Sequence, residues 1–158
     1  MDFEAFFLSQ YRPVVGLAAL LCGNRSIAED LAQEAFVSAH RRWEQVSKYD
    51  DPPAWIRRVV ANLAVSSVRR KVREVRALAR LGQARGPSSR EIGAEDEGYW
   101  RAVRALPRRQ AQCVALRYLE DRSIGDIATI LELAPSTVRV HLHHARSTLA
   151  RRLGEIEE

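Results

Sequence analysis

The sequence predicts an all-α protein of two small helical domains joined by a flexible linker. Apolar side chains recur at intervals of three and four residues over long stretches. No alternating run of Val, Ile and Thr between turn residues predicts a strand. The composition changes over residues 82–98, which hold four glycines, a proline and four acids with little apolar content. We therefore expect domains at 1–81 and 99–158, with the linker between them.

The charge of the chain points to a polyanionic partner. The 158 residues carry a formal net charge of +5, and the basic residues are concentrated in two stretches, 46–85 and 101–158. An acidic spacer at 86–100 separates these stretches. Two basic regions on one chain suggest two contacts with the same nucleic acid.

The rest of the composition argues against several other classes of protein. The two cysteines, Cys22 and Cys113, lack CxxC spacing and are expected to be reduced and buried. The N-terminus has no signal-peptide pattern, and no apolar run approaches 18 residues. We expect a cytoplasmic protein that is not embedded in a membrane and needs no cofactor or metal.

The first 46 residues predict two helices. Asp2 can cap a helix that ends near Leu21, and Pro13 is expected to kink or split it. Ser26 and Glu29 have the spacing of a capping box and predict a second helix from Ile27 to about Val46.

This second helix offers an aromatic side chain beside acids. Asp30, Gln33, Glu34 and Phe36 lie within two turns of a segment that already carries an apolar stripe. Two interpretations remain open from the residues alone: the group forms a docking surface, or Phe36 belongs to the core and the acids are solvated.

A third helix is predicted from Ala54 to about Leu81, after an irregular loop at 48–53. Arg58, Asn62 and Ser66 stand four residues apart and form one polar row along it. A dense basic run follows, which favours contact with phosphates. Its members are Arg69, Arg70, Lys71, Arg73 and Arg76.

The C-terminal domain predicts a helix-turn-helix from Ser123 to Arg152. Two helices, Tyr99–Ala105 and Arg108–Leu119, lead into it. Ser123 and Asp126 form a capping box, Glu132–Ala134 break the helix, and Pro135 can begin the next one.

The polar face of this last helix suits the DNA major groove. An arginine can bind guanine through two hydrogen bonds, and an exposed aliphatic side chain can contact a thymine methyl group. The alternative is a solvated face on an ordinary helical hairpin. The side chains on this face are Ser136, Arg139, Val140, His143, His144 and Ser147.

Three ordered motifs resemble those of the extracytoplasmic-function (group IV) sigma factors of the sigma-70 family, and the opening resembles the actinobacterial SigE-like branch. The stretch AEDLAQEAF (28–36) resembles region 2.2, and AWIRRVVANLAVSSVRR (54–70) resembles regions 2.3 and 2.4. The stretches at 105–128 and 136–149 resemble regions 4.1 and 4.2. The resemblance implies a helical region 2 bundle and a region 4 helix-turn-helix.

The resemblance also implies partners and roles: RNA polymerase core enzyme, promoter DNA and, as a candidate, an anti-sigma factor, with a monomer when free. The positions that match the core-polymerase surface are Asp30, Leu31, Gln33, Glu34 and Phe36. Those that match contacts to the minus-ten element are Tyr49, Arg58, Asn62, Ser66, Arg69 and Arg70. Those that match contacts to the minus-thirty-five element are Ser136, Thr137, Arg139, Val140, His143, His144 and Arg146.

Some positions depart from the family pattern. Glu132 stands where a turn glycine is usual, which leaves room for a different turn conformation, because a non-glycine residue in the left-handed region costs about 1 kcal/mol. His141 and His144 stand at positions that are often Arg, which should lower DNA affinity.

Three other functions compete with this one. A helix-turn-helix repressor or activator acting without core polymerase would need a dimer interface, and no spare apolar helix provides one. An enzyme would need a catalytic set or a metal site, and the histidines at 141–144 have no carboxylate or thiol at ligand spacing. A protein-interaction adaptor would leave the second basic region unexplained.

Overall fold

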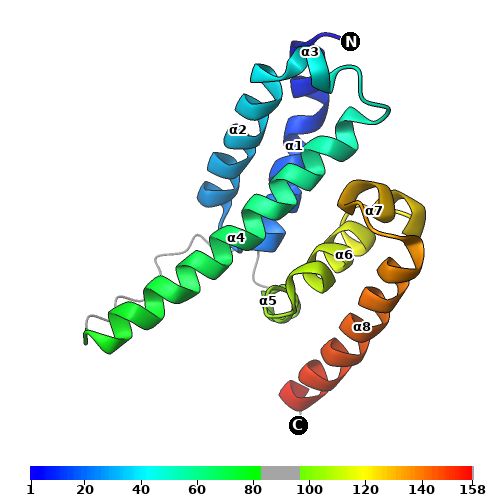
Figure 1. Ribbon diagram of the computed structural model, residues 1–158. Helices are drawn as coiled ribbons and strands as arrows, with labels where there is room; N and C mark the ends of the chain where they lie inside the picture. The colour runs from blue at the N-terminus through cyan, green and yellow to red at the C-terminus, as the bar shows by residue number, and fades with distance from the viewer. Residues whose placement is uncertain (83–96, 158) are drawn as a thin grey trace.

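A computed structural model describes residues 1–82 and 97–157, and these residues form helices and no strand. The predicted all-α class is confirmed. Figure 1 shows two helical bundles side by side, the first made of α1 to α4 and the second of α5 to α8. The elements are α1 (Phe3–Cys22), α2 (Arg25–Arg41), α3 (Trp43–Val46), α4 (Pro52–Arg80), α5 (Glu97–Arg104), α6 (Arg108–Tyr118), α7 (Ile124–Leu131) and α8 (Pro135–Glu157).

Helix α1 is the central element of the first bundle and packs against both α2 and α4. Asp2 caps it as predicted, with a carboxylate oxygen that accepts from the Ala5 amide at 2.8 Å. The predicted split at Pro13 is not found, because α1 runs unbroken from Phe3 to Cys22. Proline removes a single backbone hydrogen bond, and the fully buried side chains of Val14 and Leu17 just beyond it hold this part of α1 in the core.

By length and apolar composition alone, α1 is also the one helix of the described residues that could cross a membrane. Its burial in the first bundle accounts for that composition.

The second helix begins earlier and ends earlier than the sequence suggested. Asn24 is the N-cap of α2, with its side-chain oxygen 3.0 Å from the Ile27 amide, and Ser26 lies in the first turn. Gly23 ends α1 in a left-handed conformation, so the next residue is already placed to cap α2. At the other end, Arg42 has non-helical backbone angles and separates α2 from the single turn of α3.

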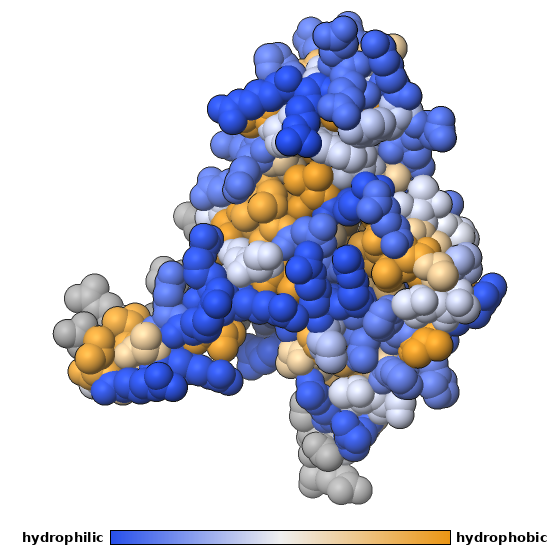
Figure 2. Space-filling view, viewed as in Figure 1, coloured by the Kyte–Doolittle hydropathy of each residue, from blue (hydrophilic) through white to orange (hydrophobic). Residues whose placement is uncertain are grey.

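Helix α4 begins at Pro52, two residues before the predicted start. Asp51 caps it by accepting from the Ala54 amide at 3.0 Å. Both prolines fit the first helical turn, where their missing N–H groups have no intrahelical partner. The C-terminal part of α4 extends beyond both bundles (Figure 1), and it mixes apolar with hydrophilic surface (Figure 2). Three apolar side chains exposed there are Val72, Val75 and Leu78.

The second bundle contains the predicted helix-turn-helix. The Ser123–Asp126 capping box is present in both directions, α7 ends at Leu131, and α8 begins at Pro135. Glu132 adopts the left-handed conformation (φ 56°, ψ 47°) that a glycine would take in this turn. The expectation that Glu132 changes the turn conformation is therefore wrong. The buried side of α8 is an apolar stripe opposite the polar face, with Leu153 half-buried at its end. Its buried members are Val138, Leu142, Ala145 and Leu149.

The two bundles are packed against each other, which the linker prediction did not anticipate. Helices α1 and α4 of the first bundle contact α5, α6 and α7 of the second. Residues 97–98 of the predicted linker are the first residues of α5, and its residues 83–96 lie outside the described part of the chain. The core is continuous from the first bundle to the second.

Candidate nucleic-acid interface

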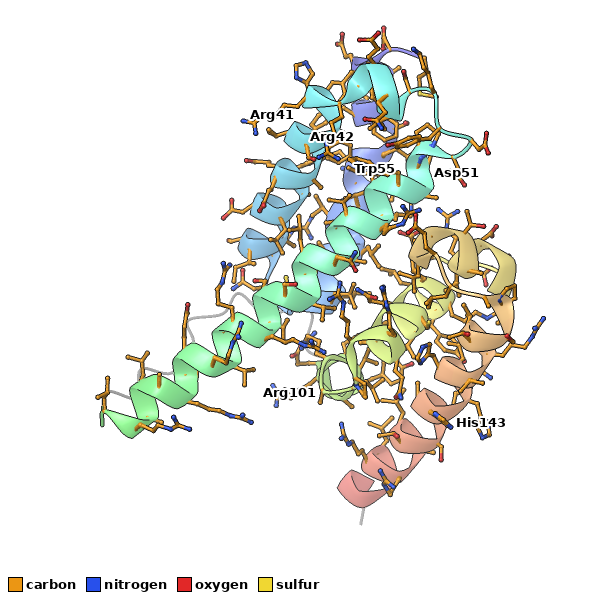
Figure 3. The ribbon with its side chains drawn as sticks, viewed as in Figure 1. Arg41, Arg42, Asp51, Trp55, Arg101 and His143 are labelled. Carbon is orange, nitrogen blue, oxygen red and sulfur yellow. The ribbon has the colours of Figure 1, made fainter. Side chains whose placement is uncertain are left out.

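The outer face of α8 is open to solvent. Val140 has 51% of its surface exposed. Arg139, His143 and His144 are exposed beside it, and the two imidazole rings lie 5.9 Å apart. Figure 3 shows His143 on α8, far from the N-terminal end of α4 where Asp51 and Trp55 lie. The structure therefore brings the proposed base-reading residues together on one free helix face, with Ser136 exposed and Thr137 half-buried at its start.

Arg146 has a partner within its own bundle. Its Nε donates to the Tyr118 hydroxyl at 2.7 Å, and its guanidinium lies 5.8 Å from the centre of the Tyr118 ring. No local pattern predicts this contact, because the two residues are 28 positions apart. The contact with Tyr118 orients the guanidinium of Arg146 at the edge of the exposed α8 face.

The third histidine of α8 has a different environment from the exposed pair. His141 is half-buried. Burial lowers the pKa of its imidazole, and the positive charge of Arg109 and the nearby His144 lower it further.

No group of three His, Cys, Asp or Glu side chains within 1–82 and 97–157 has the arrangement of a metal site.

The first residue of the polar row on α4, Arg58, is occupied by the second bundle. Its Nε donates to the Ile130 carbonyl at 2.8 Å, and one terminal nitrogen lies 2.6 Å from the Glu132 carboxylate. Its other terminal nitrogen is 3.4 Å from the Thr129 carbonyl. A side chain assigned by the family resemblance to promoter DNA is thus directed at the end of α7.

The second residue of the row, Asn62, is occupied in the same way. Its side-chain oxygen accepts from Arg108 at 2.7 Å and from Gln112 at 3.1 Å, both on α6. The next positions along α4 are open, because Ser66, Arg69 and Arg70 are exposed. The polar row is therefore covered over its first two turns and free beyond them.

Tyr49 lies beside a hollow of about 390 Å³ at the start of α4. Its ring is 6.3 Å from that of Trp55, and both are half-buried. The hollow has the aromatic wall that an unstacked base requires. Its other walls include Thr129 and Glu132 of the second bundle. The packing of the two bundles therefore encloses one side of the hollow.

The predicted core-polymerase surface divides into two sets. Asp30, Gln33 and Glu34 are exposed along one side of α2. Leu31 and Phe36 are buried, and Phe36 has only 3% of its surface exposed. The interpretation of Phe36 as an exposed docking residue is therefore corrected: of the two interpretations, the core position is right.

The aromatic cluster of the first bundle explains the burial of Phe36. Its ring lies between 5.1 and 5.9 Å from the rings of Phe6, Phe7 and Tyr11, all on α1. The apolar stripe of α2 and the aromatic-rich face of α1 meet here. One edge of the cluster opens into a hollow of about 330 Å³. That hollow is lined by Phe3, Phe7, Gln33, Phe36, Val37, His40 and Arg41.

The residues that join the two bundles were not predicted from the sequence. Arg57 is 4% exposed and binds the Glu120 carboxylate at 2.7 Å. Gln112 is fully buried and donates to the Ala61 carbonyl at 3.1 Å. Arg57 and Arg58 are adjacent arginines, and the partner of Arg57, Glu120, is 63 positions away. No local sequence pattern therefore shows which of the two arginines is buried.

The geometry defines a class of protein: two helical bundles, one with a helix-turn-helix whose outer face is free, on a basic chain. Comparison with protein families gives two matches, "Sigma-70 region 2" over residues 6–74 and "Sigma-70, region 4" over residues 97–149. The chain therefore belongs to the sigma-70 family of RNA polymerase sigma factors, in the extracytoplasmic-function group.

Individual relatives agree with this family. The ECF sigma factor SigM of Mycobacterium tuberculosis is 30% identical over 96% of this chain and 77% of its own length. The sigma-E factor of Streptomyces antibioticus is 32% identical over 80% of this chain and 70% of its own.

A solved structure shows the same fold. The sigma factor RpoE of Bartonella quintana, solved in complex with the anti-sigma factor NepR, superimposes with a TM-score of 0.72 at 21% identity, covering 97% of each chain. As a sigma factor, the chain directs core polymerase to promoters. The alternative of a helix-turn-helix regulator acting without polymerase is not favoured.

Proposed function

We propose that this sigma factor divides its promoter contacts between residues 1–81, as region 2, and residues 99–158, as region 4. The observation that carries the proposal is the free face of α8, where Arg139, Val140 and the two exposed histidines lie side by side. This set combines a donor for guanine, an apolar contact for a thymine methyl group and two smaller polar groups. Region 4 reads the minus-thirty-five element with this face, together with Ser136, Thr137 and Arg146.

Region 2 contacts the minus-ten element through the polar row of α4 and the hollow beside Tyr49. Arg58, Asn62 and Ser66 contribute the row, while Arg69 and Arg70 bind phosphates near its end. The exposure of Ser66, Arg69 and Arg70 supports this assignment directly. The aromatic wall of Tyr49 and Trp55 supports capture of an unstacked base.

Core polymerase docks on the exposed side of α2, through Asp30, Gln33 and Glu34. Leu31 and Phe36 are buried and contribute indirectly, because their packing holds α2 in position. The protein performs no chemistry of its own and works in the cytoplasm, associated with the nucleoid when in holoenzyme. An anti-sigma factor is a candidate partner, since the Bartonella relative was solved with one.

In vitro transcription with core enzyme tests the proposal. Wild-type protein should direct initiation from a subset of a promoter library, and Asp30→Arg should abolish core binding while the thermal melt stays in place. Glu44→Arg, a reversal of another exposed acid of region 2, is the matched control and should bind core normally. Core binding by Asp30→Arg at the wild-type level would contradict the docking assignment.

A further inference from the structure

A cleft of about 770 Å³ lies between the second half of α4 and the start of the second bundle. Its volume is within the range of about 300–1,000 Å³ that is typical of small-molecule sites. One wall belongs to α4, and the facing wall comes from the end of α5, the loop after it and the first turns of α6 (Figure 1). The cleft therefore has the size and the two-sided shape of a ligand site.

The charge of the cleft is positive on both walls. No Asp or Glu is among its lining residues in the part of the chain that the structure describes. The arginines of the α4 wall stand four and three residues apart, so they share one face of the helix. The five lining arginines are Arg69, Arg73 and Arg76 on α4, with Arg104 and Arg108 opposite them.

Most of this charge has no counter-charge within the protein. Arg104 is paired with the Glu97 carboxylate at 2.6 Å, and Arg108 donates to the neutral side-chain oxygen of Asn62 at 2.7 Å. Within residues 1–82 and 97–157, no carboxylate forms an ion pair with the three arginines of the α4 wall. The cleft is thus suited to an external anion.

Arg108 gives a second, independent indication of a missing anion. Its Nε–H group is shielded from water and has no hydrogen-bond partner among the described residues. Burial lowers the pKa of its guanidinium, and the positive charges of Arg109 and Arg69 lower it further. A buried donor without an acceptor costs free energy. A small rotation of the side chain toward a bound anion would give this donor an acceptor and reduce the repulsion.

The cleft also has apolar walls, which an inorganic anion would leave without contact. A planar ring can pack against such walls, and guanidinium groups stack on the faces of planar rings. The apolar lining residues are Leu21, Val65, Val68, Val72, Leu106 and Ala111.

We propose that this cleft binds a nucleoside polyphosphate. The phosphates lie between Arg69, Arg73 and Arg76 on one wall and Arg108 on the other, because arginine binds phosphate oxygens through paired, charge-assisted hydrogen bonds. Arginines on both walls require more than one phosphate group. The base packs on the apolar residues, which a DNA duplex, with its phosphates on a wide polar surface, cannot reach in this way.

The ligand would act on promoter binding through residues that the two sites share. Ser66 and Arg69 line the cleft and also belong to the proposed contacts with the minus-ten element. This consequence rests on the proposed function, whereas binding itself does not. A ligand held by both walls also stabilises the packing of the two bundles, because it binds only where both are present.

Isothermal titration calorimetry on the full-length free chain, in a low-salt buffer without phosphate, tests the proposal with GTP as the probe. GTP should bind at one site per chain. Inorganic tripolyphosphate should bind more weakly, because it lacks the ring, and guanosine should not bind. Absence of GTP binding, or binding at several sites per chain, would overturn the proposal. Equal affinities for GTP and tripolyphosphate would overturn the assignment of the nucleoside.

Variants of single arginines locate the site. Arg108→Gln should weaken GTP binding about 10-fold or more, and Arg73→Ala about 3- to 10-fold. Arg80→Ala removes the same charge from another exposed position of α4 outside the cleft, and it should change the affinity less than about 2-fold. Because Arg73 is exposed, its variant keeps the test valid even if Arg108→Gln does not fold. Equal losses for Arg73→Ala and Arg80→Ala would show that GTP responds only to net charge, and would overturn the proposal.

The two proposals fail in different ways. If wild-type holoenzyme does not initiate at promoters, the proposed function is wrong whatever the calorimetry shows. If it initiates normally and the free chain does not bind GTP, only the ligand site is wrong.

Discussion

The two DNA-binding regions of this sigma factor differ in how accessible their proposed contacts are. In region 4, the face of α8 that carries Arg139 and Val140 is exposed. In region 2, Arg58 and Asn62 on α4 are bound to residues of region 4. The spacing of polar side chains along each helix identified both faces from the sequence. Exposure in region 4 follows from local periodicity, whereas exposure in region 2 depends on contacts with residues 46 or more positions away.

The largest expected effect concerns the buried aromatic side of the docking helix. Phe36→Ala should destabilise the protein by about 3–5 kcal/mol, because it removes a ring packed against three others. Val140→Ala, at an exposed position in region 4, should change stability by less than about 0.5 kcal/mol. Denaturant unfolding measures both. A small effect at Phe36 would show that the cluster repacks, and would reopen its role as a surface residue.

The second prediction separates base reading from backbone contact. Arg139→Ala should cost about 1–3 kcal/mol and relax the preference at one base pair of the promoter. Arg69→Ala should weaken binding similarly for all sequences and flatten its salt dependence, because phosphates carry no base information. Holoenzyme titrations over single-base promoter variants distinguish the two. The assignment fails if Arg139→Ala weakens every variant equally while Arg69→Ala alters the preference.

The third prediction compares one thiol in each region. Burial raises the pKa of Cys113 in region 4 from 9.0 to about 11. Burial also raises the pKa of Cys22 in region 2, where the half-buried thiol lies 3.2 Å from the Asn24 carbonyl. The unfolded chain releases these protons first as pH rises, so the free energy of unfolding should fall between pH 9 and about pH 11.

The loss from Cys113 should be about 2 kcal/mol across that interval. Chemical denaturation at each pH measures the free energy of unfolding. The quantity compared between variants is the slope of this free energy against pH, not its absolute value. Cys113→Ala should flatten the slope, even though it also leaves a small cavity. Cys22→Ala should flatten it less, since this thiol keeps more contact with solvent. Equal slopes for wild type and Cys113→Ala would contradict the burial effect.

The same capping motif succeeded once and failed once in the sequence analysis, and the reason is local. Ser123 and Asp126 cap α7 as predicted, since no competing signal precedes them. Ser26 and Glu29 have equivalent spacing, yet Asn24 caps α2. Gly23 turns the chain in the left-handed region, and the residue after it takes an extended conformation suited to a cap. A motif thus predicts a helix start only when no better cap lies upstream.

The contact between the regions could not be predicted from the sequence. Charge patterning identified the basic stretches, and periodicity identified the faces. Neither shows that Arg57 is buried while Arg58, next to it, remains half-exposed. That difference arises only when α7 and the Glu120 loop approach α4, so it depends on a tertiary contact between residues 63 positions apart.

The smallest predicted effect concerns His141, which tests whether the inner side of α8 responds to pH. Burial lowers its pKa below the usual 6.5, so the unfolded chain binds this proton more readily than the folded one. The free energy of unfolding should therefore fall only slightly as pH decreases from about 6.5, because solvent screens most of the effect at this half-buried site. His141→Gln should remove this part of the pH dependence. His143→Gln, on the exposed side of the same helix, is the matched control and should retain it. If both variants lose the dependence equally, the effect belongs to the helix as a whole and not to the half-buried imidazole of His141.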